Sequence, residues 1–366
     1  MKIEKTVETV VNNVMKNLKS SFVKEQVIQK KRIDSTSLKE IFITTSNLDV
    51  EVKSHNNPYI DIILKTYENG PEMDVIYSED KLEVSVVNSK QSSVQVAIIP
   101  FTKVVPFTKM EFYVPTAVAE SWDVRSGSAD INFTDVIMNK LAIHTGSGDI
   151  SLSDIEAGEI KVRCASGDVK CKDIKSDSCM TKSASGDMVF RKLIVSNMTT
   201  ESSSGDILLT DHQGANLEVK MGSGDVDLND IDVVNGTIVL HSGDVDANRV
   251  QAEMLNIDNK SGDIGIDNFT GVVNGSNGSG DITLGVQNEC TINLDANSGD
   301  IAVKLAKEIG MNATVDVTSQ SEDITTNLPL QLKDDSSRLL GVTGEGENTI
   351  RITTKTGDVK VYMEGK

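Results

Sequence analysis

The sequence predicts an all-β protein built on a parallel β-solenoid (β-helix) of about ten coils, each 19 residues long. Three observations predict this fold class: a tripeptide recurs at nearly constant spacing, apolar and polar residues alternate inside each repeat, and the repeat region contains no proline. A repeat this short leaves no room for the crossover helix of a βαβ unit. Stacked coils are therefore the parallel arrangement that fits.

The repeat is marked by Ser-Gly-Asp, which occurs nine times between residues 147 and 300, and Ser128-Ala129-Asp130 precedes the series as a variant. The aspartates recur every 19 residues, apart from one spacing of 18. Ser321-Glu322-Asp323 and Thr356-Gly357-Asp358 echo the motif at wider spacing. Coils stacked at about 4.8 Å would give a rod of roughly 48 Å for ten repeats.

Apolar residues alternate at fixed positions when each repeat is numbered from its serine. Positions 4 and 6 are apolar throughout, as in Ile150 and Leu152, and positions 14 and 16 follow the same rule, as in Ile160 and Val162. This period of two is typical of strands with one buried face. We therefore expect two short strands and two corners in each coil.

The amino-acid composition agrees with closely stacked coils around a narrow interior. Aromatic residues make up only 4% of the chain. No proline lies between Pro115 and Pro329, which fits stacked coils because each coil must donate backbone hydrogen bonds to its neighbour and proline has no N–H to donate. Glycine at the corner would supply a positive φ. The expected corner glycines are Gly148, Gly167, Gly186, Gly205, Gly224, Gly243, Gly262, Gly280 and Gly299. By analogy with parallel crossovers, we expect a right-handed solenoid.

The segments outside the repeats differ from the repeats and from each other. Residues 1–32 carry eight basic and three acidic residues, and the spacing of Val7, Val11, Val14 and Leu18 predicts a basic amphipathic helix there. Residues 33–127 are expected to form a β-rich N-terminal cap, residues 128–324 the solenoid, and residues 325–366 a C-terminal β cap. Strands are predicted in the caps over residues 41–43, 48–52, 59–63, 82–86, 350–352 and 359–362.

Charge and hydropathy exclude several classes of protein. The formal net charge of −19 disfavours a general nucleic-acid binder, which needs a basic face. No run of 18 apolar residues predicts a transmembrane helix, and the first 20 residues lack the apolar core of a signal peptide. These features predict a cytoplasmic location. Four cysteines are too few for a disulfide scaffold of this length.

Several motifs together resemble a known family. They are the opening Thr45-Ser46-Asn47-Leu48-Asp49-Val50, the Phe112-Tyr113-Val114-Pro115 stretch that leads into the first corner, and the Ser-Gly-Asp series. Over about residues 40–366 the chain resembles the bacterial putative-adhesin family of β-strand-repeat proteins, a domain of unknown function. The resemblance implies a β-helical, non-enzymatic body associated with the cell envelope or cell surface.

The search for reactive groups gives no catalytic residue and no cofactor. Three of the histidines, His144, His212 and His241, fall at different repeat positions, so they do not form one column. Cys171 and Cys179 fall at inward positions, where cysteine behaves as a small apolar residue. The glycine-rich run at residues 275–280 leads into a strand and not a helix, so a phosphate-binding loop is not expected.

The aspartate column is the one repeated chemical feature. We expect each carboxylate to cap its own turn through backbone N–H groups. The alternative is calcium binding, since Gly and Asp at β-coil turns can ligate Ca²⁺. The metal candidates under that alternative are Asp149, Asp168, Asp187, Asp206, Asp225, Asp244 and Asp263.

Two main functional hypotheses follow. The first is a non-enzymatic structural or interaction module, adhesin-like or associated with the cell envelope, whose partner is a protein or an envelope surface. In this hypothesis residues 1–32 either touch an anionic membrane or fold onto the acidic solenoid. The second is a carbohydrate-active enzyme on a β-helix, which would need a cleft-forming insertion that the regular repeats do not leave. A filament of end-to-end rods is disfavoured by the distinct terminal segments.

Overall fold

The computed structural model describes residues 26–87, 108–320, 323–335 and 338–363. It confirms an all-β protein with a parallel β-solenoid. The chain divides into two compact units, Met1–Asn139 and Lys140–Lys366, and the boundary falls inside strand β9 (Ile131–Ser147). The domain boundaries expected from the sequence at residues 32, 127 and 324 stay predictions.

The N-terminal unit consists of short strands in two ladders. Its strands are β1 (Gln26–Asp34), β2 (Glu40–Thr45), β3 (Asp49–His55), β4 (Tyr59–Tyr67), β5 (Glu72–Tyr77), β6 (Lys81–Val87), β7 (Lys109–Pro115) and β8 (Ser121–Ser128), followed by the start of β9. Parallel pairing joins β6, β2 and β8 in one ladder, and β7, β3 and β9 in the other. Antiparallel strands extend both ladders. β5 pairs with β6 in the first, and in the second β4 pairs with β7 and β1 pairs with β4. Side chains from the two ladders meet between them, and the rings of Trp122 and Phe133 lie edge to face at 5.4 Å between centroids.

The expected helix over residues 1–32 is wrong for its last seven residues. Residues 26–32 belong to β1, which pairs antiparallel with β4 from Gln26 opposite Tyr67 to Asp34 opposite Tyr59. The helical spacing that motivated the prediction ends at Leu18, whereas Val27 and Ile28 are β-branched and suit a strand. The pairing with β4 satisfies their backbone groups. Residues 1–25, on which the rest of this prediction falls, lie outside the described residues.

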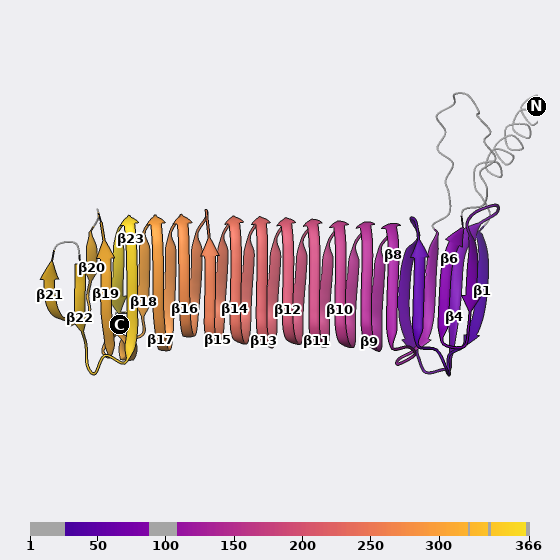
Figure 1. The fold of residues 1–366 in the computed structure, drawn as a ribbon, viewed down its shortest axis with the longest axis horizontal. Helices are drawn as coiled ribbons and strands as arrows, with labels where there is room; N and C mark the ends of the chain where they lie inside the picture. The colour runs from indigo at the N-terminus through magenta and orange to yellow at the C-terminus, as the bar shows by residue number, and fades with distance from the viewer. Residues whose placement is uncertain (1–25, 88–107, 321–322, 336–337, 364–366) are drawn as a thin grey trace, which may run out of the picture. The chain divides into compact units, whose positions relative to one another are not determined.

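The C-terminal unit contains the stacked coils, seen side by side in Figure 1. One strand runs through most of each coil: β10 (Ile150–Ser166), β11 (Val169–Ser185), β12 (Met188–Ser204), β13 (Ile207–Ser223), β14 (Val226–Ser242), β15 (Val245–Asn259), β16 (Ile264–Ser279) and β17 (Ile282–Ser298). Successive strands are parallel, and each paired residue of β10 lies opposite the residue 19 positions later in β11. The repeat length therefore sets the register.

Each coil has three stretches that pair with the next coil, so the expectation of two strands per coil is wrong. Pairing between β10 and β11 is interrupted at Asp154 and Gly158, and the stretch between them buries Ile155 and Ala157. Asp154 has φ 56°, a left-handed conformation in which Asp and Asn are enriched. The equivalent residues in β11 to β16 also have positive φ; they are Asp173, Lys192, Asp211, Asp230, Arg249 and Asn268. The sequence pattern missed this side because its second inward position is not consistently apolar, as Ala157 and the buried Ser176 of the next coil show.

The Ser-Gly-Asp corners are built on glycines with φ between 99° and 124°, conformations that other residues rarely adopt. All nine expected corner glycines have such values; they are Gly148, Gly167, Gly186, Gly205, Gly224, Gly243, Gly262, Gly280 and Gly299. A Cβ on Gly224 would also lie 2.4 Å from the carbonyl oxygen of Gly205 in the preceding coil. Backbone conformation and close stacking therefore both require glycine.

The end of the chain folds back into the stack. After β17 come β18 (Ile301–Leu305), the short helix α2 (Lys307–Gly310), β19 (Ala313–Ser319), β20 (Ile324–Thr326), β21 (Gln331–Asp335) and β22 (Arg338–Val342). The last strands, β23 (Asn348–Thr356) and β24 (Val359–Met363), then insert between earlier ones. β23 pairs in parallel with both β17 and β19, and β24 with both β18 and β20. The motif at Thr356-Gly357-Asp358 thus supplies the corner that follows Asp300.

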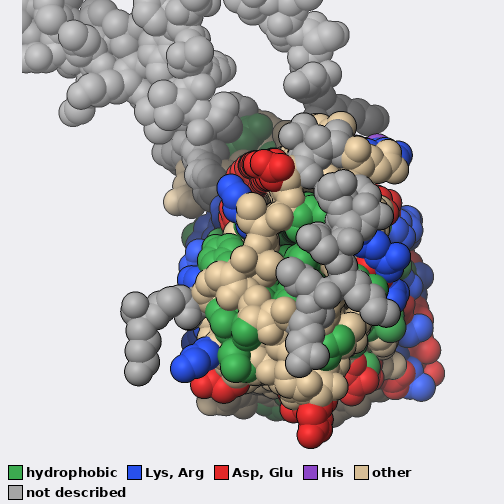
Figure 2. Space-filling view, turned by 90° about the vertical axis from the view of Figure 1, so that its left-hand side faces the viewer, with side chains coloured by type: hydrophobic (Ala, Val, Ile, Leu, Met, Phe, Trp, Pro, Cys, Tyr) green, Lys and Arg blue, Asp and Glu red, His purple; other side chains and the backbone are tan. Residues whose placement is uncertain are grey.

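An antiparallel layer closes this end, where β19 pairs with β22 and β22 with β21. Figure 2 views this end and shows hydrophobic side chains in separate groups between polar ones. Such atypical end strands cover open sheet edges. Within the described ranges, no helix has the length and apolar character needed to cross a lipid bilayer.

Candidate functional site

The aspartates of the corners form a hydrogen-bonded column in the C-terminal unit. Oδ1 of each accepts the backbone N–H of the aspartate one coil further along, at 2.7–3.1 Å between oxygen and nitrogen. The acceptors include every metal candidate from the sequence: Asp149, Asp168, Asp187, Asp206, Asp225, Asp244 and Asp263. The carboxylates therefore cap the next coil and not their own turn, because stacking places the neighbouring N–H nearest to them.

This arrangement gives the aspartates a structural role. One oxygen of each carboxylate is already taken by the backbone, and a cation would compete with that bond. Among the residues that the structure describes, no group of three or more His, Cys, Asp and Glu could hold a metal ion. Calcium binding by the column stays an untested hypothesis.

A second column, two residues before the serine of each corner, supports the same corner and was missed in the sequence. Thr145 and Ser183 donate their hydroxyls to the carbonyls of Ser147 and Ser185, at 2.7 and 2.9 Å. Asn277 donates to the carbonyls of both Gly262 and Gly280 at 3.0 Å. The signal in the sequence is the small or polar residue two positions before several of the serines. These side chains give the corner carbonyls a hydrogen-bond partner within the chain.

The cysteines and His212 are buried core residues. Cys171 and Cys179 are 2% and 1% exposed, which confirms the inward positions expected for them. Burial raises the pKa of the Cys179 thiol to about 12. His212 is fully buried between Leu193 and Ile231 of the adjacent coils. Burial, which the backbone of Leu193 only partly opposes, lowers the pKa of His212 to about 4. These groups have the character of structural residues.

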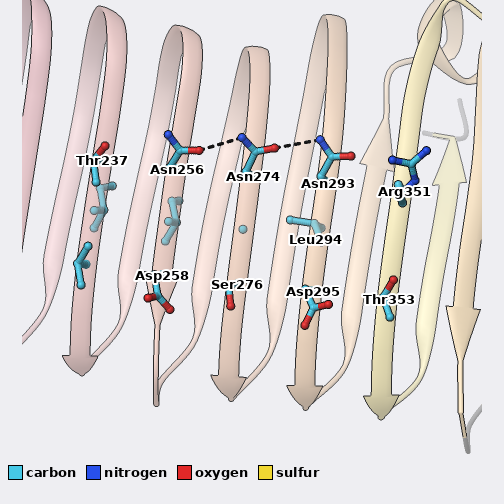
Figure 3. A pocket seen from close by; sticks show the side chains of 14 residues that line it. Thr237, Asn256, Asp258, Asn274, Ser276, Asn293, Leu294, Asp295, Arg351 and Thr353 are labelled. Carbon is cyan, nitrogen blue, oxygen red and sulfur yellow. Dashed lines mark hydrogen bonds between the residues drawn. The ribbon is translucent and has the colours of Figure 1, made fainter.

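The best candidate for a binding site is a depression on the outer face of the coils, with a volume of about 520 Å³. We call it the polar groove and define it by the outward side chains of Thr237, Asn256, Asp258, Asn274, Ser276, Asn293, Asp295, Arg351 and Thr353. These residues come from β14, β15, β16, β17 and β23, which are neighbours in the sheet. Figure 3 shows them in two parallel rows that cross the strands.

The first row is a ladder of three amides. Nδ2 of Asn274 donates to Oδ1 of Asn256 at 2.8 Å, and Nδ2 of Asn293 donates to Oδ1 of Asn274 at 2.9 Å. Register alone explains this ladder, because the three residues are paired neighbours on successive strands. Asparagine at position 15 of the repeats that begin at Ser242 and Ser279, and at position 14 of the 18-residue repeat between them, is the sequence signal that could have revealed it. Arg351 continues the row beyond Asn293.

The second row holds Asp258, Ser276 and Asp295 in register. Between the rows the floor is formed by Ile257, Gly275 and Leu294. Gly275 has no side chain in the inward column, and Leu294 leans into that space, since a Cβ on Gly275 would lie 2.8 Å from Leu294 Cδ2. The smallest residues of both columns, Gly275 and Ser276, thus lie together at the middle of the groove.

Charged residues in the groove differ from several charged residues elsewhere on the same face. In earlier coils Lys182 pairs with Glu201 at 2.6 Å and Lys220 with Glu218 at 2.5 Å. Asp258, Asp295 and Arg351 form no ion pair or hydrogen bond through their side chains with the described part of the chain. The carboxylate next to Arg351 in the sheet, Asp316, already accepts hydrogen bonds from Nε and Nη2 of Arg338 at 2.8 Å. The groove therefore presents three charged groups that can contact a ligand.

Comparison with known protein families identifies the family of this chain. The model of Toastrack DUF4097, a domain of unknown function, matches residues 38–217 and 213–362. The chain belongs to this family. The match confirms the resemblance drawn from the Ser-Gly-Asp series and its flanking motifs, and it extends over both units of this Toastrack chain.

Solved structures similar to this Toastrack chain include three from bacteria. A putative cell adhesion protein from Clostridium sporogenes is 8% identical with a TM-score of 0.18, over 93% of this chain and 100% of that one. A putative lipid binding protein from Parabacteroides distasonis is 13% identical with a TM-score of 0.29, over 94% and 99%. A putative adhesin from Bacteroides fragilis is 12% identical with a TM-score of 0.24, over 93% and 99%. No curated protein matches this chain, and none of these similarities is close enough to transfer a role.

Proposed function

We propose that this chain is a non-enzymatic, adhesin-like scaffold that attaches to a bacterial cell-envelope surface through the polar groove. The observation that supports the proposal most directly is the set of three charged groups in the groove, Asp258, Asp295 and Arg351, that form no ion pair with the described part of the chain, whereas Lys182 and Lys220 on the same face are paired. Unpaired charges at the edge of a depression are available to a partner without first breaking internal contacts.

The form of the groove supports a binding role over a catalytic one. It is shallow, and its two rows repeat the same side-chain types on successive strands. A repeating surface suits a repeating or extended partner, whereas catalysis needs one reacting point surrounded by converging groups. The rigid stack of coils holds the rows at fixed spacing, which lowers the entropy lost on binding.

Two finer parts of the proposal concern location. Association with the cell envelope follows from the family resemblance. Peripheral membrane contact through residues 1–32 would be a second attachment; residues 1–25 lie outside the described residues, and β1 occupies the rest of that segment. In this proposal the groove makes the specific contact and the N-terminal segment only adds to it.

Co-sedimentation of the full chain with isolated cell-envelope material tests the proposal. We expect the chain to pellet with the material, and the double substitution Asp258→Asn and Asp295→Asn to weaken retention at least fivefold. The matched control is Asp232→Asn, an exposed aspartate of β14 outside the groove, which should leave retention unchanged. No retention of the parent chain, or equal loss in the control, would reject the groove as the attachment site.

A further inference from the structure

We infer that the polar groove binds an uncharged, hydroxyl-rich oligosaccharide chain that lies along the stacking direction of the coils. This inference rests on the proposed function and names the chemical class of the ligand. It draws on the amide ladder, the row of Asp258 and Asp295, and the small residues at the middle of the groove.

The amide ladder leaves hydrogen-bonding capacity unused on every coil. A side-chain amide has two N–H donors and an oxygen with two lone pairs. In Asn274 the ladder uses one N–H and one lone pair, through its bonds to Asn256 and Asn293. One donor and one acceptor remain at this coil. A sugar hydroxyl can accept from the first and donate to the second, so a polyhydroxylated chain matches a row of such amides.

The second row complements the first. Asp258 and Asp295 only accept hydrogen bonds when ionised, whereas Arg351 only donates and Ser276 does both. A hydroxyl group can satisfy all three kinds of partner, because it is a donor and an acceptor at once. A ligand that crosses the groove therefore needs many groups of this dual type, and carbohydrate chains carry several on each ring.

Geometry sets the orientation of the chain. Both rows run across neighbouring strands, so their repeat equals the strand spacing of about 4.8 Å. One ring of an extended β-1,4-linked chain is close to this length. Each ring can then face one coil, with the short side chain of Ser276 leaving room for the bulk of the ring at the middle of the groove.

Charge favours a neutral ligand. The groove contains both signs, with Asp258 and Asp295 in one row and Arg351 at the end of the other. A polyanion would be repelled by the two carboxylates and by a chain of net charge −19, and a basic peptide, although attracted by the carboxylates, would be repelled by Arg351. A hydroxyl-rich chain avoids both conflicts, since it can hydrogen-bond to charged groups of either sign.

Titration calorimetry of the full chain with four probes tests this inference. The neutral probes are cellohexaose and chitohexaose, the anionic probe is poly(glycerol phosphate), and the cationic probe is hexalysine. We expect at least one neutral hexasaccharide to bind, with Asn274→Ala weakening its affinity at least tenfold. The matched control is Asn216→Ala, the middle residue of a second asparagine ladder with bonds of 2.8 and 3.1 Å outside the groove. That control should change affinity less than twofold.

The two substitutions remove the same kind of ladder, so similar melting temperatures would show that any difference in affinity comes from the groove. Binding of neither neutral probe, or equal losses in the two variants, would overturn the inference. Binding of only poly(glycerol phosphate) or only hexalysine would overturn it as well and assign a charged ligand. If envelope retention persists and depends on Asp258 and Asp295 while no hexasaccharide binds, the proposed function stands and only the ligand class fails.

Discussion

Oδ1 of Asp206 accepts the backbone N–H of Asp225, one coil further along, at 3.0 Å between oxygen and nitrogen. The same bond then links Asp225 to Asp244. We predict that Asp225→Ala lowers the free energy of unfolding by about 1 kcal/mol, because the N–H of Asp244 loses its acceptor. Asp225→Asn should cost less than half as much, since an amide oxygen can accept the same bond. Urea denaturation of the two variants measures the difference, and equal costs would contradict the capping role.

The same bonds predict little response to calcium. Each Oδ1 of the column is occupied by a backbone N–H, as for Asp206 and Asp225. A ligand that bound only the folded state would raise the melting temperature by mass action. We expect the melting temperature to stay unchanged in millimolar Ca²⁺ and in chelator. A steep rise with Ca²⁺ but not with Mg²⁺ would make the aspartate column a metal site.

The corner glycines should be hard to replace. Gly224 has φ 118°, and a Cβ there would lie 2.4 Å from the carbonyl oxygen of Gly205. We predict that Gly224→Val lowers the free energy of unfolding by about 3 kcal/mol or more, because backbone strain and a backbone clash add. The control is Gly265→Ala, where the nearest atom is the movable carboxylate oxygen of Asp246 at 2.9 Å. Similar losses for both variants would argue against the corner geometry.

Buried His212 should make the protein acid-sensitive. Its pKa is about 4 in the folded chain, below the ordinary value of 6.5, so the unfolded state takes up the proton first as pH falls. Its contribution to stability is intact above pH 6.5 and falls progressively down to about pH 4, a total of about 3 kcal/mol. His212→Leu, which matches Leu193 in the adjacent coil, should remove this part of the pH dependence.

Thermal melts between pH 7 and 4.5 measure this effect. The exposed residue His241 provides the control, because His241→Asn changes an exposed histidine that lies next to the corner at Gly243. We expect the His212→Leu variant to lose about 2 kcal/mol less than the parent over this range, and His241→Asn to follow the parent. Parallel pH profiles for all three proteins would show that the ring of His212 is not buried as described.

Much of the fold could be predicted because the repeat is so short. Strict spacing of Ser-Gly-Asp fixes the register, and the inward residues at positions 4, 6, 14 and 16 fix two sides of the coil. The third side was missed because its second inward position is not consistently apolar, as Ala157 and Ser176 show, and its positive-φ residue, such as Asp154, has no fixed identity along the coils. The insertion of β23 between β17 and β19 was also missed, since pairing across a gap of 58 residues leaves no local pattern.

The polar groove was harder to predict than the fold. Its residues lie in four consecutive repeats and in β23, and only the stacking brings Asn293 next to Arg351. Whether a charged residue is free depends on its neighbours across the coils, as the pairing of Asp316 with Arg338 shows. The sequence alone drew attention to the aspartate column, whose repetition reflects the demands of the corner.

Protection of a thiol introduced by Ser276→Cys tests the central claim most directly, because this position lies at the middle of the groove. The native cysteines are buried, which keeps their reaction with a neutral maleimide slow. We predict that cell-envelope material slows labelling of the Ser276→Cys thiol at least fivefold and leaves unchanged the labelling of Ser196→Cys, an exposed position outside the groove. Equal rates for Ser276→Cys with and without the material, or equal protection of both thiols, would contradict attachment through the polar groove.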